Sequence, residues 1–442
     1  MRKYFLFIIL LTGSLLFGRE ISLAEAEQLA LKNNLQIKIS ELSLERSLAS
    51  RRETRSNFFP TVNSFYQLTN NLELPVVVID IDGDGPLPPQ ELKMGSDYSS
   101  TAGIQLAYPV FTGSAIISGQ LIASSAVNLS ELSLQEQVNT VLYTIRVLYY
   151  QIQMLESMID ATEQGLLSAK ENYELALKRK SVGQGTQLDV LQAKVRYESY
   201  KPQLVSLKNQ LVSAKSNLMT YMNDPDMKDI RVSGALEQVR NPYTGFTIKD
   251  LQEITLNERL ELQMADEQKK IAAYQRNIAW SSIMPKVQIA SSVQWQSNVN
   301  ALSDLDHRRN SNVSLSVSLP LFTGGKSAAG IQKAAIGVKE AHYQKDQIED
   351  FVLNDVDAAY RKVEEMQSNI DATENVVKQA EEALRLSKLL YETGSATQLD
   401  LMTAESGFIG AKSNYISSVF QYNVAVEGLK KALNNLLTYH GE

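Results

Sequence analysis

The stretch Gly394-Ser-Ala-Thr-Gln-Leu-Asp400 has a second copy in the chain, at Gly183-Gln-Gly-Thr-Gln-Leu-Asp189. The two copies lie 211 residues apart, and the same offset joins Pro109-Val-Phe-Thr-Gly113 to Pro320-Leu-Phe-Thr-Gly324. A constant offset between such distant landmarks indicates an ungapped internal duplication. The sequence therefore predicts one architecture built from two similar halves.

A long segment without proline precedes each copy of this stretch, from Gly113 to Gly183 and from Gly324 to Gly394. Apolar residues recur in it at steps of three and four, which is the heptad pattern of helices that pack lengthwise on neighbours. We expect helices over 113–183 and 324–393, each of ~105 Å at 1.5 Å per residue. Gly183 and Gly394 would end them in left-handed caps. Thr186 and Thr397 would cap the helices that run back over 188–222 and 398–438.

Two segments, 60–109 and 285–320, alternate apolar and polar residues with the period of a β-strand. Val287, Ile289 and Val293 alternate with Lys286, Gln288 and Ser292. Each segment begins after one proline and ends at another, so we expect two β-hairpins, or four strands per chain. A membrane barrel needs about eight strands, and an open sheet edge in lipid leaves its backbone unpaired. The strands must therefore be pooled with those of other copies, with the polar face toward a water-filled lumen.

The remaining segments complete two repeats. Residues 1–20 resemble a secretory signal peptide, with Arg2 and Lys3 before an apolar run too short to span a bilayer. The first repeat covers 21–222 and begins with a helix over 22–57. An irregular connector over 223–246 leads to the second repeat, 247–442, which begins with a helix over 247–281.

Composition excludes several classes of function. A formal net charge of −7 gives no reason to expect nucleic-acid binding, and the absence of cysteine excludes disulfides. His307, His342 and His440 show no metal-ligand spacing, and no combination of serine, histidine and carboxylate suggests an enzyme active site. We therefore expect an exported protein without catalytic activity or an obligatory cofactor, which is either soluble or inserted in an outer membrane.

One stretch in the first hairpin matches a calcium-binding pattern. Asp80, Asp82, Asp84 and Glu91 satisfy the spacing D-x-D-x-D-G-x5-E, which offers the alternating oxygen ligands and the twelfth-position carboxylate that calcium prefers. Against this, three prolines replace the usual loop residues, and we expect no helices on either side. The alternative is an acidic loop without a metal ion.

Over essentially all of the predicted mature chain, the sequence resembles the TolC-like outer-membrane efflux proteins. The resemblance rests on the duplicated P-[VL]-F-T-G junctions, the duplicated G-x-x-T-x-L-D turns, the long helices and the two hairpins. It implies a mainly α protein with a small β part. Three chains would form an α-barrel of long helical hairpins, continued by a 12-stranded transmembrane β-barrel in outer-membrane lipid. Such homotrimers are passive ducts that extend into the periplasm. They pass drugs, toxic small molecules or polypeptides supplied by an inner-membrane pump through a periplasmic adaptor, as in tripartite efflux and type I secretion.

The resemblance also assigns roles to residues at the helical turns. Asp400 matches the first acidic residue of a ring at the pore entrance, whereas Thr403 stands in the place of the second. Tyr391 and Asp189 match a pair that ties the closed state together, and Ala396 replaces an arginine often found beside them. Both aspartates also fit a plain first-turn position, where a carboxylate is favoured by the helix dipole.

Two alternatives stay open at this point. Lys178-Arg-Lys180 fits either a solvated last helical turn or an adaptor contact. The heptads alone would also suit a secreted coiled-coil structural or adhesive protein, although that class does not explain the four amphipathic strands.

Overall fold

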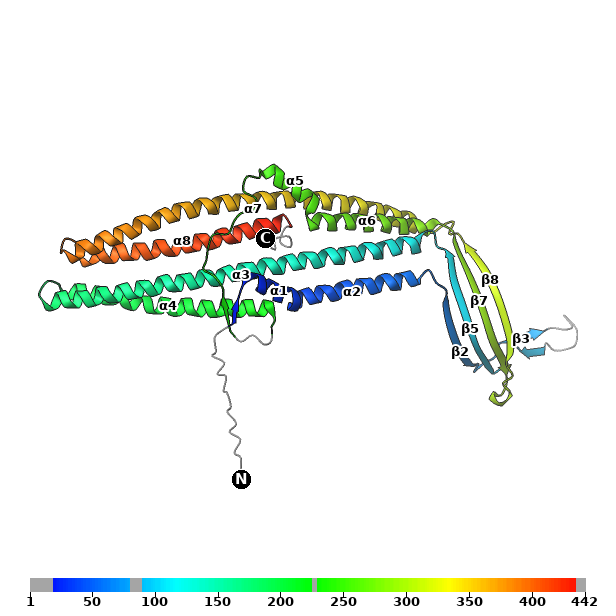
Figure 1. Cartoon of the computed structure of the whole chain (residues 1–442). Coiled ribbons are helices and arrows are strands. Elements are labelled where there is room, and N and C mark those ends of the chain that lie inside the picture. Colours follow the sequence, from blue (N-terminus) through cyan, green and yellow to red (C-terminus); the bar gives the residue numbers. More distant parts are fainter. Residues whose placement is uncertain (1–18, 80–89, 225–228, 435–442) are drawn as a thin grey trace, which may run out of the picture. The chain divides into compact units, whose positions relative to one another are not determined.

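The computed structural model describes residues 19–79, 90–224 and 229–434 (Figure 1). The predicted signal segment therefore lies outside the described residues except at its end. The chain divides into two compact units. Unit 1 comprises residues 1–43, 131–263 and 346–442, and unit 2 comprises residues 44–130 and 264–345.

The two long helices form as predicted. They are α3 (Ala115–Ser181) and α7 (Lys326–Glu392), each of 67 residues. The return helices are α4 (Gln187–Met222) and α8 (Gln398–Ala432). The heptad positions are buried within unit 1, as Val141 and Ile152 of α3 and Val356 and Met366 of α7 show. α8 ends before the predicted residue 438, and Asn434 has a positive φ of 57°.

The first helix of each repeat was predicted as continuous, and this is wrong. α1 (Leu23–Asn33) is separated from α2 (Leu35–Ser56) by Asn34, and α5 (Ile248–Glu258) is separated from α6 (Leu260–Trp280) by Arg259. Both separating residues have extended backbones, with ψ of 129° and 126°. They lie 225 residues apart, as do the N-cap residues Ser22 and Thr247. The breaks are therefore part of the duplicated architecture.

Unit 2 contains an antiparallel sheet in the order β2 (Thr61–Asn70), β5 (Tyr98–Phe111), β7 (Lys286–Val299) and β8 (Arg308–Ser318) (Figure 1). The two hairpins thus join into one sheet through β5 and β7. β5 continues past Pro109, where it was predicted to end, because a register shift between Pro109 and Phe111 accommodates the proline. The first hairpin also carries a small two-stranded sheet, β3 (Val76–Ile79) with β4 (Gln90–Lys93).

The strand register confirms one apolar and one polar face. One row across the sheet pairs Val62 with Leu106, and another pairs Ile289 with both Tyr108 and Leu315. The adjacent row on the opposite face pairs Gln288 with Ser316. Many apolar side chains of the first face are exposed in the single chain, such as Val313 at 77% and Leu315 at 67%. This sheet therefore has an apolar surface that the described chain leaves uncovered.

The connector contains a strand that the sequence did not predict. β6 (Ile230–Val232) pairs in parallel with β1 (Arg19–Ile21), and Ile21 and Ile230 are fully buried in the core of unit 1. Two short 3-10 helices, η1 (Ser281–Ile283) and η2 (Leu302–Asp304), complete the described elements. None of the described helices is both long and apolar enough to cross a membrane.

A chain of buried charges ties three helices of unit 1 together. Arg146 of α3 donates to Glu27 of α1 at 2.6 Å and to Glu427 of α8 at 2.7 Å, and Lys430 pairs with Glu427 at 2.7 Å. These four side chains are at most 8% exposed. Each buried charge has a partner of opposite sign, which burial of ionised groups requires.

Candidate functional site

The two helical turns predicted from the duplicated stretch have the same geometry. Gly183 and Gly394 adopt φ of 76° and 81°, the left-handed conformation that glycine accommodates without strain. The amide of Gln184 donates to the carbonyl of Arg179, and the amide of Ser395 donates to the carbonyl of Leu390. These bonds occupy the last free carbonyls of α3 and α7. The glycine caps are therefore confirmed.

Asp189 and Asp400 each close a capping box at the start of the returning helix. The Asp189 carboxylate accepts from the Thr186 amide and hydroxyl at 2.8 Å, and Thr186 accepts from the Asp189 amide. Asp400 and Thr397 repeat these bonds. The bonds from Thr397 hold the pKa of the exposed Asp400 carboxyl below its usual range. The first-turn role is therefore confirmed for both aspartates.

Thr403 lies one turn further along α8, where its side chain is exposed. Its hydroxyl donates to the carbonyl of Leu399 at 2.8 Å. Asp400 and Thr403 are thus both exposed close to the beginning of α8, at the sequence positions where the resemblance implies pore-facing residues.

Arg179 contacts Tyr391, and this contact joins the ends of α3 and α7. The Arg179 guanidinium lies 4.5 Å from the centre of the Tyr391 ring, and it also donates to the Tyr391 carbonyl at 2.5 Å. Tyr391 is only 4% exposed. Burial raises the pKa of its phenol, Arg179 opposes this rise, and the charge of Asp189 adds to it. Asp189 therefore acts on Tyr391 through its charge, while its hydrogen bonds go to Thr186.

The sequence interpretation missed Arg179. Within the run 178–180, Lys178 and Lys180 are exposed, as expected of a solvated last turn, but Arg179 is half-buried. Gly185 packs closely against this turn of α3, since a Cβ at that position would come within 3.2 Å of the Lys180 backbone nitrogen and 3.3 Å of the Arg179 Cβ. The small residue in the turn and the adjacent arginine are the only sequence signals of this contact.

Two polar side chains of α8 are buried beyond the turn. Gln398 is 2% exposed, and neither atom of its side-chain amide has a hydrogen-bond partner among the described residues. Glu405 is 1% exposed and accepts from the Asn172 amide at 3.0 Å. Burial raises the pKa of the Glu405 carboxyl, although hydrogen bonds with Ser168 and Asn172 and the charge of Arg196 oppose this rise. Burial of the Gln398 amide without such hydrogen bonds costs free energy of folding where α8 packs in unit 1.

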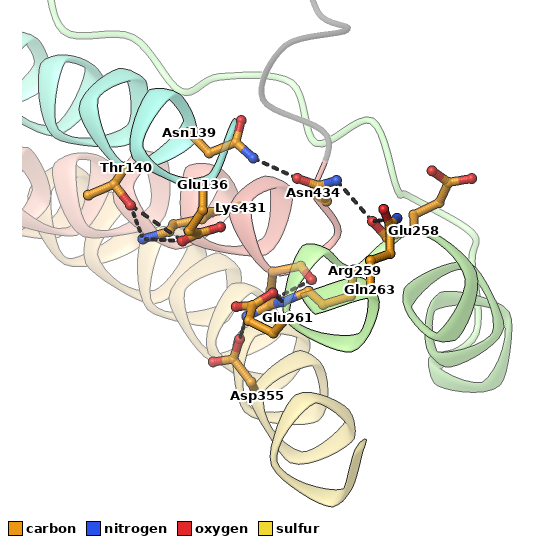
Figure 2. Close-up of polar contacts among 11 residues, drawn as sticks. Glu136, Asn139, Thr140, Glu258, Arg259, Glu261, Gln263, Asp355, Lys431 and Asn434 are labelled. Carbon is orange, nitrogen blue, oxygen red and sulfur yellow. Dashed lines mark hydrogen bonds and ion pairs between the residues drawn. The ribbon is translucent and has the colours of Figure 1, made fainter. Parts of the chain in front are cut away.

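A second polar cluster lies around the break between α5 and α6 (Figure 2). The Arg259 guanidinium lies between Glu261 and Asp355, at 2.7 and 2.8 Å, and also donates to the carbonyl of Ala432. The Asn434 side chain accepts from Asn139 at 2.6 Å. These contacts hold the end of α8 against α3, α6 and α7.

The same region borders a cavity of about 670 Å³ in unit 1. Three carboxylates line it, but Glu261 and Asp355 bind Arg259, and Glu136 lies 4.0 Å from Lys431. Burial raises the pKa of the Glu136 carboxyl, and the charge of Glu261 raises it further. The pairing of opposite charges makes this cluster a structural one and gives it no excess charge for a ligand.

The structure leaves the calcium prediction untested. Asp80, Asp82 and Asp84 lie outside the described residues, and Glu91 lies on β4, where it is exposed. Among the residues that are described, no group of three or more histidine, cysteine, aspartate or glutamate side chains could hold a metal ion.

Comparison with known proteins places this geometry in a family. The sequence model of the outer membrane efflux protein family matches residues 26–224 and 251–435, which include both repeats. The outer membrane efflux protein BepC of Brucella suis is 20% identical over 431 residues, which covers 97% of this chain and 89% of that protein. The alkaline protease secretion protein AprF of Pseudomonas aeruginosa is 21% identical over 337 residues, covering 76% of this chain and 70% of that protein.

Solved structures agree on the fold. The outer membrane protein VceC of Vibrio cholerae aligns with a TM-score of 0.76 at 19% identity, covering 93% of this chain and 96% of that one. CusC aligns with a TM-score of 0.79 at 16% identity, covering 94% and 93%. The fold is therefore that of the TolC-like channels, mainly helical with a small β part.

The family match covers both duplicated halves, including the four strands that a secreted coiled-coil protein would not explain. The alternative of a structural or adhesive coiled coil is thereby excluded. The family places the protein in the outer membrane, from which it extends into the periplasm as an exit duct. The chain belongs to the outer membrane efflux protein family.

Proposed function

We propose that three copies of this chain form a passive duct, which exports compounds delivered by an inner-membrane pump through a periplasmic adaptor. The observation that carries the proposal is the sheet of unit 2. β2 and β8 form its two edges, and each pairs with only one strand of the described chain. One face is apolar and the other polar. Edge pairing between three copies would give twelve strands with the polar face inward.

The exported substrate would be chosen by the pump and not by this chain. Names among the relatives include efflux proteins and protease secretion proteins. Both roles suit a duct without a catalytic centre. We therefore assign the substrate only to the broad class of drugs, toxic small molecules and polypeptides.

In this duct, the two helical turns would form the periplasmic entrance. Asp400 is exposed and its pKa is lowered, so it carries a full negative charge at neutral pH. Three copies would bring three such charges together, which attracts cations and repels anions. Thr403 contributes no charge, so the ring would have one acidic layer.

Planar-bilayer recordings of the detergent-purified protein test the duct function. We expect discrete conductance steps with a preference for cations. A protein that inserts into liposomes but shows no conductance under any voltage or salt condition would contradict the proposal. The corresponding test in vivo measures export of the pump's substrate from cells. We expect cells that lack the gene to lose this export and a wild-type copy of the gene to restore it.

A further inference from the structure

Exposed aromatic residues mark all four connections between the helices and the sheet in unit 2. Phe58 and Phe59 lie between α2 and β2, and Phe111 lies at the end of β5. Trp280 ends α6 before β7, and Phe322 lies between β8 and α7. Their exposed fractions range from 39% to 89%. Aromatic side chains at one level of a membrane protein are typical of the boundary between lipid and water.

Three of these four connections carry an excess of basic residues, and the fourth, between β5 and α3, carries no charge. The segments 48–60, 109–125, 273–286 and 318–333 contain seven basic residues and one acidic residue, whereas the whole chain has a net charge of −7. The basic residues are Arg51, Arg52, Arg55, Arg276, Lys286, Lys326 and Lys333. All except the half-buried Arg51 are exposed. The ends of the helices and strands at these connections therefore carry a net positive charge.

Three of these arginines line a single hollow. Arg51, Arg52 and Arg55 of α2, together with Phe58 and Phe59, border a cavity of about 540 Å³. Gln120 and Ser124 of α3 form its other side. On a helix of 3.6 residues per turn the three arginines fall within about 100° of one another, and Glu53, the acidic neighbour, falls outside this sector. Planar guanidinium groups bind phosphate oxygens in pairs, and the phenylalanines provide an apolar surface beside them.

We propose that this hollow binds the headgroup of an anionic phospholipid in the leaflet that meets the base of the sheet. The phosphate would lie among the three arginines, and the acyl chains would pass Phe58 and Phe59 toward the apolar face of the sheet. A soluble acidic ligand would explain the arginines but not the aromatic residues at all four connections. The proposal relies on the proposed function only in placing the sheet in a membrane.

Native mass spectrometry of the full chain in detergent tests the site, with phosphatidylglycerol as the probe. We expect the variant carrying Arg51→Gln, Arg52→Gln and Arg55→Gln to bind phosphatidylglycerol at least about tenfold more weakly, since each basic residue near an anionic surface strengthens binding roughly fivefold. The control carries Lys170→Gln, Lys201→Gln and Lys378→Gln, which remove the same charge from exposed positions. This control should retain wild-type binding.

Three results would overturn the site. They are unchanged phosphatidylglycerol binding by the arginine variant, equally tight binding of phosphatidylethanolamine by the wild type, and displacement of the lipid by an equal concentration of inorganic phosphate. An unchanged number of chains in the assembly and an unchanged melting temperature show that the variant is folded, and if it fails to fold, Arg52→Gln alone should still weaken binding. Failure of the proposed function is distinguishable, because the wild-type protein would then show no conductance in planar bilayers, whatever its affinity for phosphatidylglycerol.

Discussion

Replacement of Arg179 with alanine should loosen the contact between the ends of α3 and α7. Arg179 is the side chain that donates to the Tyr391 carbonyl and lies over the Tyr391 ring. In the proposed duct these helix ends form the periplasmic entrance. Loss of the contact should therefore favour conformations in which the two helical hairpins separate, and the channel should open more often.

The size of the effect follows from the two interactions. A hydrogen bond from a charged donor contributes about 1.5–3 kcal/mol, and a cation–π contact at a partly exposed site about 0.5–1 kcal/mol. Arg179 is half-buried, so solvent screening reduces the sum. We take about 2 kcal/mol, which corresponds to a change of roughly 30-fold in the equilibrium between closed and open states.

Single-channel recordings in planar bilayers measure this equilibrium as open probability. Lys178→Ala is the matched control, since it removes the same charge from an exposed neighbour. Arg179→Lys should give an intermediate value, because lysine keeps the charge but not the planar group that stacks on the ring. Tyr391→Phe should change open probability by less than about twofold, because it keeps the ring and the carbonyl. Equal open probabilities for Arg179→Ala and Lys178→Ala would refute the reasoning.

Four further predictions concern separate sites. Asp400→Ala should lower cation selectivity and trivalent-cation block in bilayer recordings, and unchanged values would leave Asp400 as a helix-start residue only. Arg146→Ala removes the buried ion partner of Glu27 and leaves Glu427 with Lys430 alone, so we expect thermal denaturation to report a loss of about 3–5 kcal/mol, whereas a loss under 1 kcal/mol would contradict this. Burial raises the folded-state pKa of Glu405, so the stabilisation by its protonated form is present below the unfolded pKa and is lost as pH rises through the folded pKa. Glu405→Gln should therefore weaken the dependence of the melting temperature on pH between pH 4 and 8, and an unchanged dependence would contradict this. If the loop at residues 80–91 binds calcium, millimolar calcium should slow its proteolysis and Asp82→Ala should abolish the protection, whereas no calcium effect on the wild type would favour the acidic loop.

The parts of the fold that depend on periodicity could be predicted from the sequence. The heptads located the buried positions of α3 and α7, such as Ile145 and Val352, because the helical period alone decides which residues share a face. Strand alternation separated the two faces of the sheet in the same way. Because the two halves are copies, the helix and strand boundaries recognised in one half then predicted those in the other.

Features that depend on distant partners could not be predicted. At the break at Asn34, the side-chain oxygen makes a local cap by accepting from the Gln36 amide, but the side-chain amide donates to the Tyr221 carbonyl, 187 residues away. The break at Arg259 is likewise held by contacts to Asp355 and Ala432. No local pattern encodes such pairs.

The same limit applied to the candidate site. The capping boxes of Asp189 and Asp400 are local and could be predicted from a spacing of three residues. The Arg179–Tyr391 contact joins residues 212 positions apart, so a basic run that would be solvated on an isolated helix contains one residue with a tertiary role. β1 and β6 were missed because three residues are too few to show an alternation.

The central claim is that three copies of this chain form one duct, and the mass of the detergent-extracted assembly tests it most directly. Light scattering corrected for bound detergent measures that mass. The account predicts three chains of 49.2 kDa each, less any segment removed on export, in a single species. A well-folded monomer whose strands are intact by circular dichroism would contradict it.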